Sequence, residues 1–109
     1  MATKLKTPLH PGEILREDYL VPLDLSAGRL AKALGVPRTR IERIVKEEIG
    51  ITTDTALRLG RYFDTTPNFW LNLQQSYDLA IGVEQLKGDL DAIEPRASND
   101  NRKAAGVRA

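Results

Sequence analysis

The stretch that most constrains the fold runs from residue 27 to residue 46, with the sequence AGRLAKALGVPRTRIERIVK. Ala31 is small enough to let a second helix cross closely, and Gly35 can take the left-handed conformation that ends a helix. The pattern predicts two helices joined by a tight turn, with the polar face of the second helix free to enter a DNA major groove. The residues expected to point inward from both helices and the turn are Leu30, Leu34, Val36, Ile41 and Ile44.

The size and composition of the chain limit the classes of protein that it can belong to. Its 109 residues are enough for one small domain with a core of roughly 70–90 ordered residues. Because there is no cysteine, disulfides and thiolate metal sites are excluded. The first twenty residues are interrupted by charges and contain no long apolar run. We therefore expect no signal peptide, no membrane span and a cytoplasmic location.

The charges are strongly segregated along the chain, although its formal net charge is only +1. Residues 26–46 carry a net +5, whereas residues 47–95 carry a net −6. A basic stripe confined to the two helices of the turn is the electrostatic pattern that a DNA-binding protein needs. A charged helix face can also be merely solvated, and it is the spacing of Ala31 and Gly35 that favours DNA recognition here.

Helix start and stop residues predict an all-α fold of five helices, with no β pattern of useful length. A weaker amphipathic segment at residues 84–93 forms a C-terminal extension. We expect a flexible arm at 1–8, a DNA-binding and dimerisation domain at 9–94, and a disordered tail at 95–109. The expected helices run from Pro11 to near Pro22, over 27–34 after the cap Ser26, over 37–47, from a cap at Thr52 or Thr53, and from Thr66 to about Ala80.

The outward face of the helix over residues 37–47 carries the candidate DNA-reading side chains. Arg38 and Thr39 lie in its first turn, and Arg43 lies one turn further along the same face. Arginine can donate two parallel hydrogen bonds to guanine O6 and N7, and threonine can read several base edges. We expect phosphate contacts from Arg40 on the flank, from Lys46, and from Ser26 with the free N–H groups at the start of its helix.

The residues directly after this helix are acidic. Glu47 and Glu48 stand where a basic or glycine-containing loop facing the phosphates would be more typical. Carboxylates in such a loop would repel the DNA backbone. We therefore expect both side chains to point away from it.

The last expected helix carries a broad apolar stripe formed by Phe69, Trp70, Leu73 and Tyr77. We assign Phe69 and Leu73 to the core. A two-fold dimer seam is expected from the remainder of the stripe, because recognition of a palindrome needs two reading helices about 34 Å apart. The residues assigned to this seam are Trp70, Tyr77, Leu79 and Ile81.

The sequence offers no support for catalysis, a metal ion or a cofactor. His10 is the only histidine, and no further ligands are spaced to complete a metal site with it. We expect it to be a capping or surface residue at the start of the first helix. There is no paired nucleophile and base and no phosphate-cradling glycine loop, so we expect no enzyme.

Three segments together resemble the HigA-type, also called VapI-like, antitoxin branch of the Xre (lambda-repressor-like) transcription regulators. They are HPGEILREDYL, LAKALGVPRTRIERIV and GITTDTALRLGRYFDTTPNFWLNLQQSYDL, within residues 9–80. The resemblance implies a five-helix lambda-repressor-like fold, a homodimer, a palindromic operator upstream of its own operon, and a small RelE-like ribonuclease toxin as partner. It also implies that Arg38, Thr39 and Arg43 read bases, and that Arg40, Thr52 and Thr53 contact the DNA backbone.

The sequence departs from this family pattern at two places. Ala27 stands where many members of the wider group carry a phosphate-binding glutamine, and the loop over residues 46–50 is unusually acidic. Two alternatives follow. The chain could be a stand-alone Xre-type regulator without a toxin, or a protein–protein module whose acidic second half binds a partner while DNA binding is weak.

Overall fold

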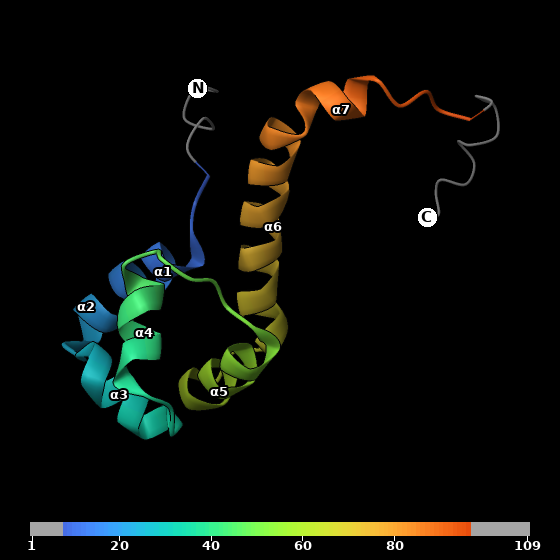
Figure 1. Ribbon diagram of the computed structural model, residues 1–109. Helices are drawn as coiled ribbons and strands as arrows, with labels where there is room; N and C mark the ends of the chain where they lie inside the picture. Colours follow the sequence, from blue (N-terminus) through green and yellow to red (C-terminus); the bar gives the residue numbers. More distant parts are fainter. Residues whose placement is uncertain (1–7, 97–109) are drawn as a thin grey trace.

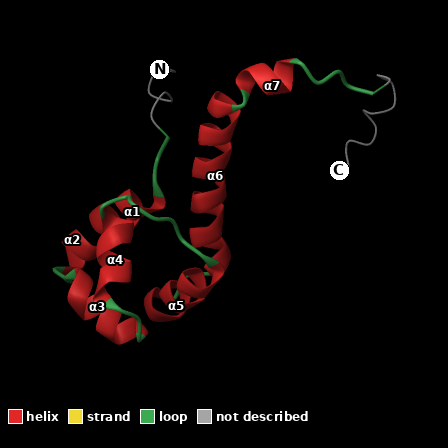
Figure 2. Cartoon of the chain, in the orientation of Figure 1, coloured by secondary structure: helices red, strands yellow, loops and turns green. Residues whose placement is uncertain are grey.

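The computed structural model describes residues 8–96, and every regular element in this part of the chain is helical (Figures 1 and 2). The all-α prediction is confirmed, including the extension at the C-terminal end. The arm expected over residues 1–8 and the tail expected over 95–109 fall almost wholly outside the described residues. In chain order the elements are α1 (Pro11–Ile14), the π-helical turn η2 (Leu15–Leu20), α2 (Val21–Leu23), α3 (Ala27–Leu34), α4 (Arg38–Val45), α5 (Thr53–Phe63), α6 (Pro67–Gln85) and α7 (Lys87–Asp91).

The first helical segment is continuous from α1 through η2 to α2, and its start is set by His10 and Pro11. The Nδ1 atom of His10 accepts a hydrogen bond from the Gly12 N–H at 2.8 Å, so the capping alternative for His10 is correct. Its imidazole is only 5% exposed, so the surface alternative is wrong. The π-helical turn ends at Leu20, two residues before Pro22, whose missing N–H would interrupt an α-helix.

Helices α3, α5 and α6 begin at the caps that the sequence predicts. Ser26 accepts a hydrogen bond from the Arg29 N–H, Thr52 from the Thr55 N–H, and Thr66 from the Phe69 N–H. Each bond satisfies one of the N–H groups that a helix start leaves without a partner. The open choice between Thr52 and Thr53 is therefore settled in favour of Thr52.

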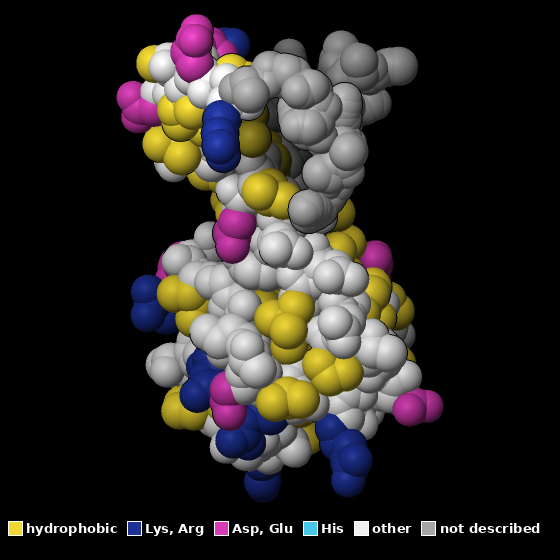
Figure 3. All heavy atoms as spheres, turned by 90° about the vertical axis from the view of Figure 1, so that its right-hand side faces the viewer, with side chains coloured by type: hydrophobic (Ala, Val, Ile, Leu, Met, Phe, Trp, Pro, Cys, Tyr) yellow, Lys and Arg dark blue, Asp and Glu magenta, His cyan; other side chains and the backbone are white. Residues whose placement is uncertain are grey.

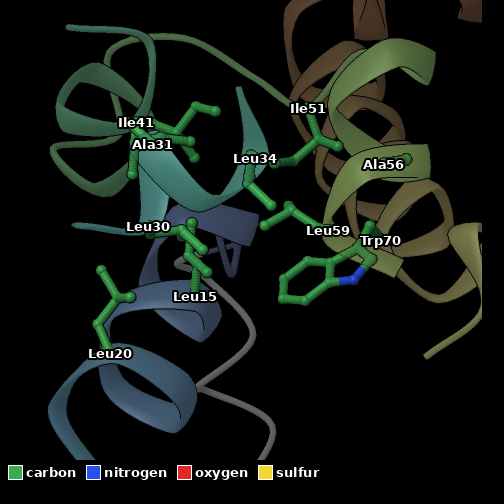
Figure 4. Packing of buried hydrophobic residues seen from close by; sticks show 11 residues of the cluster. Leu15, Leu20, Leu30, Ala31, Leu34, Ile41, Ile51, Ala56, Leu59 and Trp70 are labelled. Carbon is green, nitrogen blue, oxygen red and sulfur yellow. The ribbon is translucent and has the colours of Figure 1, made fainter. Parts of the chain in front are cut away.

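The hydrophobic core lies where η2, α3, α4, α5 and the start of α6 meet (Figure 4). Gly12 lets α1 approach α4 closely, because a Cβ atom at this position would lie 1.9 Å from the carbonyl oxygen of Ile44. Six large core side chains are completely buried, namely Leu15, Leu30, Ile41, Ile44, Leu59 and Trp70.

The assignment of Trp70 to a dimer seam is wrong, because its side chain is 0% exposed and packs into this core beside Leu59 (Figure 4). Its indole packs against Tyr19, with ring centroids 5.1 Å apart, and its Nε1–H donates to the Thr65 hydroxyl at 2.9 Å. Phe69, which we expected in the core, is 36% exposed instead. Neighbouring residues on a helix point about 100° apart, so only one of these two adjacent aromatic rings can face the core.

Helix α6 runs to Gln85, five residues beyond the predicted end near Ala80. Its first half packs against α5, whereas its second half and α7 extend away from the body of the molecule (Figure 1). Figure 3 shows this end as a separate lobe with exposed hydrophobic side chains. The fold thus divides into a compact helix-turn-helix body and a projecting C-terminal arm.

Candidate nucleic-acid interface

The crossing of α3 and α4 has the geometry that the sequence predicts. Ala31 is only 2% exposed at the crossing, and Gly35 takes a left-handed conformation with φ of +73°. The Val36 N–H closes the turn by donating to the Ala31 carbonyl at 3.0 Å. The helix-turn-helix is therefore formed by the residues whose spacing indicated it.

Helix α4 separates a buried face from an exposed one. Ile41 and Ile44 are completely buried on its inner side. On the outer side the structure brings together the three predicted base-reading residues, because Arg38, Thr39 and Arg43 are all exposed. The helix begins one residue later than expected, since Pro37 is its N-cap in extended conformation and Arg38 its first residue.

The residues predicted to contact phosphates lie around this outer face, at helix ends. Ser26 and Thr52 are exposed caps at the starts of α3 and α5, Thr53 is the exposed first residue of α5, and Lys46 is exposed at the end of α4. Helix starts offer free N–H groups and a partial positive charge to a phosphate. Arg40 is half-buried and differs from the others in being held by an ion pair.

Carboxylates lie beside all three arginines of α4. Arg40 donates to Asp54, which also accepts a hydrogen bond from Arg58, and these two bonds lower the pKa of the Asp54 carboxyl below its usual value. The other two arginines use Nε in ion pairs: Arg38 with Glu42 at 3.3 Å, and Arg43 with Glu48 at 3.4 Å. Glu48 thus folds back onto the exposed face of α4, so the expectation that its side chain points away from this face is wrong, whereas Glu47 pairs with Arg16 instead.

Three further residues hold the site together and were missed in the sequence. Arg16 donates to the Val45 carbonyl at the end of α4, and Arg58 donates to the Leu34 carbonyl at the end of α3 at 2.8 Å. Gln74 of α6 accepts from the Ile51 N–H at 2.6 Å and fixes the loop between α4 and α5. The last carbonyls of a helix need donors from outside it, but nothing in the local sequence indicates which distant side chain supplies them.

Within residues 8–96 there is no group of three His, Cys, Asp or Glu residues that could hold a metal ion. No described helix is long and apolar enough to cross a membrane. His10 is instead part of the core, and its burial lowers the pKa of its imidazole below the ordinary value of 6.5.

A tight helix-turn-helix, with an exposed basic face on its second helix, defines a protein of the helix-turn-helix DNA-binding class. Residues 15–70 match the helix-turn-helix family HTH_3, and the chain belongs to this family. Its members are DNA-binding regulators and not enzymes, in agreement with the absence of catalytic residues from the sequence pattern.

Relatives and solved structures confirm the HigA and VapI resemblance. Virulence-associated protein I of Dichelobacter nodosus is 54% identical over 91 residues, which cover 84% of this chain and 83% of that protein. Antitoxin HigA-1 of Vibrio cholerae is 32% identical over 74 residues, 68% of this chain and 70% of that protein. The structure of Pseudomonas aeruginosa antitoxin HigA with the higBA promoter matches with a TM-score of 0.80 at 47% identity, covering 82% of this chain and 98% of that chain.

Proposed function

We propose that this chain is a homodimeric repressor that binds a palindromic operator in its own promoter, and that it is the antitoxin of a HigB-HigA type operon. The observation that carries the proposal is the exposed face of α4, which presents Arg38, Thr39 and Arg43 from a correctly formed helix-turn-helix. The Pseudomonas aeruginosa relative solved with the higBA promoter supports it. Repression would follow from steric occlusion of the promoter.

The roles of the residues follow from their places on this surface. Arg38, Thr39 and Arg43 read base edges in the major groove. The phosphates on either side are held at the helix ends and by the flanking cations, which is the division of labour usual in such interfaces. The proposed phosphate-contacting residues are Ser26, Arg40, Lys46, Thr52 and Thr53.

We place the dimer seam further along the C-terminal arm than the sequence suggested. Of the expected seam residues, Leu79 is 61% exposed, whereas Tyr77 is half-buried with its ring packed against His10 at 4.8 Å. Ile81 is half-buried. On α6 the exposed apolar residues Leu79 and Val83, followed by Leu86 just after its end, are spaced by four and three, the spacing by which two helices pack along a common stripe. Leu90 on α7 and Ile93 after it are also exposed, but α7 runs in a different direction from α6 (Figure 1).

The experiment that tests the DNA-binding part is a titration of the purified protein with its own upstream DNA, at several salt concentrations and against scrambled competitor. Competitor-resistant binding that weakens steeply with salt is expected, because several phosphate contacts release counterions. Arg43→Glu should abolish this binding while the elution volume of the protein stays unchanged. Equal affinity for operator and scrambled DNA would contradict the proposal.

The antitoxin part is tested separately with the product of the neighbouring reading frame. We expect that product to be a small RelE-like ribonuclease that co-purifies with this chain and is inactive in the complex. A neighbouring protein that neither binds nor cleaves RNA would identify the chain as a stand-alone regulator and leave the DNA-binding part intact.

A further inference from the structure

Both arginines proposed to read bases pair with a carboxylate through the same guanidinium atom, Nε. Nε of Arg38 lies 3.3 Å from Oε2 of Glu42, and Nε of Arg43 lies 3.4 Å from Oε1 of Glu48. Among residues 8–96 the terminal nitrogens Nη1 and Nη2 of both arginines have no hydrogen-bond partner. In both cases the free edge is therefore the one formed by the two terminal nitrogens.

The position of Glu48 depends on the turn at the end of α4. Glu47 takes a left-handed conformation with φ of +65°, which residues with a Cβ atom rarely adopt. Its N–H donates to the Ile44 carbonyl at 2.9 Å, and the Glu48 N–H donates to the Arg43 carbonyl at 2.8 Å. Arg16 holds this turn through the Val45 carbonyl and the Glu47 carboxylate. The turn thereby returns the Glu48 backbone to the level of Arg43.

Arg38 is restrained in a similar way at the start of the helix. A Cβ atom at Gly28 would lie 3.0 Å from Cδ of Arg38, so the stem of this arginine passes directly over the first turn of α3. Glu42, one turn along α4, holds the guanidinium from the other side. The stem and Nε of Arg38 are thus both positioned before any DNA is bound.

A guanine edge requires two parallel donors, and the edge formed by Nη1 and Nη2 supplies them while Nε remains bound to a carboxylate. We propose that Glu42 and Glu48 are positioning residues that set the specificity of this DNA reader. Each orients one reading arginine toward guanine, and each adds a negative charge that weakens contacts to phosphate alone. This inference rests on the proposed roles of Arg38 and Arg43.

The physical reason for the gain in specificity is the difference between the two kinds of DNA complex. On an operator, an oriented arginine loses little side-chain freedom when it binds guanine. On other sequences the arginine has only phosphates to bind, and the neighbouring carboxylate repels those same phosphates. The carboxylate therefore weakens non-specific binding more than operator binding.

The test compares Glu48→Gln with Glu47→Gln, measuring affinity for operator and for random duplex of equal length. Glu47→Gln is the matched control, because it removes the same charge from the same loop at a carboxylate that pairs with Arg16 and not with Arg43. In this variant the turn keeps its backbone hydrogen bonds and the bond of Arg16 to the Val45 carbonyl. For Glu48→Gln we expect random DNA to bind about 2- to 5-fold more tightly, as for loss of an exposed charge pair. We expect no such gain for the operator, so the ratio of the two affinities falls. For Glu47→Gln both affinities should change in parallel. Thermal unfolding checks that both variants fold.

A second variant separates failure of this inference from failure of the proposed function. Arg43→Gln should remove most of the preference for the operator, and adding Glu48→Gln to it should leave the ratio of affinities unchanged. If Arg43→Gln itself binds like the wild type, the proposed reading site is wrong. If Arg43→Gln loses specificity but Glu48→Gln strengthens both kinds of binding equally, or changes neither, the positioning role is overturned.

Discussion

The hydrogen bond by which His10 caps the start of α1 depends on the pH of the solution. Its Nδ1 atom can accept the Gly12 N–H only while the imidazole is neutral. Burial is the main influence on the group and lowers the pKa of His10, while the carboxylates of Glu47 and Asp78 act more weakly in the opposite direction. The folded protein therefore binds a proton at His10 less readily than the unfolded chain does.

The sign of the resulting pH dependence follows from this difference. Above the unfolded pKa of about 6.5, the contribution of His10 to the free energy of unfolding is fully present. It is lost as the pH falls through the lowered pKa of the folded state. We expect the free energy of unfolding, measured by urea denaturation, to decrease as the pH falls from about 7 through the lowered pKa of His10. His10→Asn keeps a capping side chain that does not titrate, and should flatten this decrease. An equally steep decrease in the variant would contradict the assignment.

At the scale of the elements, the C-terminal ends of α3 and α4 are held by side chains from outside the helix-turn-helix. Arg16 donates to the last carbonyl of α4, as Arg58 does for α3. Each bond ties a helix end, which would otherwise fray, to an element on another side of the molecule. The orientation of α4 is thus set partly by the first helical segment.

Replacing Arg16 by methionine tests this dependence. The change preserves the apolar stem but removes the charged donor, and we expect the free energy of unfolding to fall by about 1 kcal/mol. The matched control is Lys87→Met, which breaks the exposed pair of Lys87 with Asp91 and should cost less than about 0.5 kcal/mol. Equal effects of the two variants in urea denaturation would show that the Arg16 contact does not stabilise the helix end.

The elements themselves could be predicted because their signals are local. The caps Ser26 and Thr66 and the glycine at position 35 each act on residues within a few positions, so their sequence context was sufficient. Which of the two rings, Phe69 or Trp70, is buried in the core could not be predicted from the local sequence. It depends on the angle at which α6 leaves α5 and on Thr65, which supplies an acceptor for the indole.

The candidate DNA-binding site, like the helices, could be predicted only where its signals are local in the sequence. The exposed face of α4 follows from the helical period and from the buried positions Ile41 and Ile44. The pairing of Arg43 with Glu48 was not, because it requires Glu47, a residue other than glycine, to adopt a left-handed turn. The long-range bonds of Arg16 and Arg58 span 29 and 24 residues, beyond what local spacing can indicate.

At the scale of the whole molecule, the exposed apolar stripe of the C-terminal arm makes the proposed dimer testable. Leu79→Glu places a charge at the start of the proposed seam and should shift the protein from dimer to monomer in analytical ultracentrifugation. Binding to the full palindrome should weaken by at least about tenfold, because two half-sites are no longer bound together, while binding to an isolated half-site should stay unchanged.

The control for this prediction is Leu23→Glu. Leu23 is also exposed, at 58%, but it lies in α2 on the body of the molecule. Its replacement should leave the dimer and both DNA affinities unaltered. A Leu79→Glu protein that sediments as a dimer would rule out this seam.

Helix α6 carries both a residue buried in the body, Trp70, and a residue of the proposed seam, Leu79, in one unbroken rod. In the proposed dimer, the length and pitch of α6 would therefore set the distance and the angle between the two α4 helices. One alanine inserted after Gln75 would lengthen the rod by about 1.5 Å and rotate its far end by about 100°. The proposed dimer would accept only those operators whose half-site spacing matches the separation that α6 imposes.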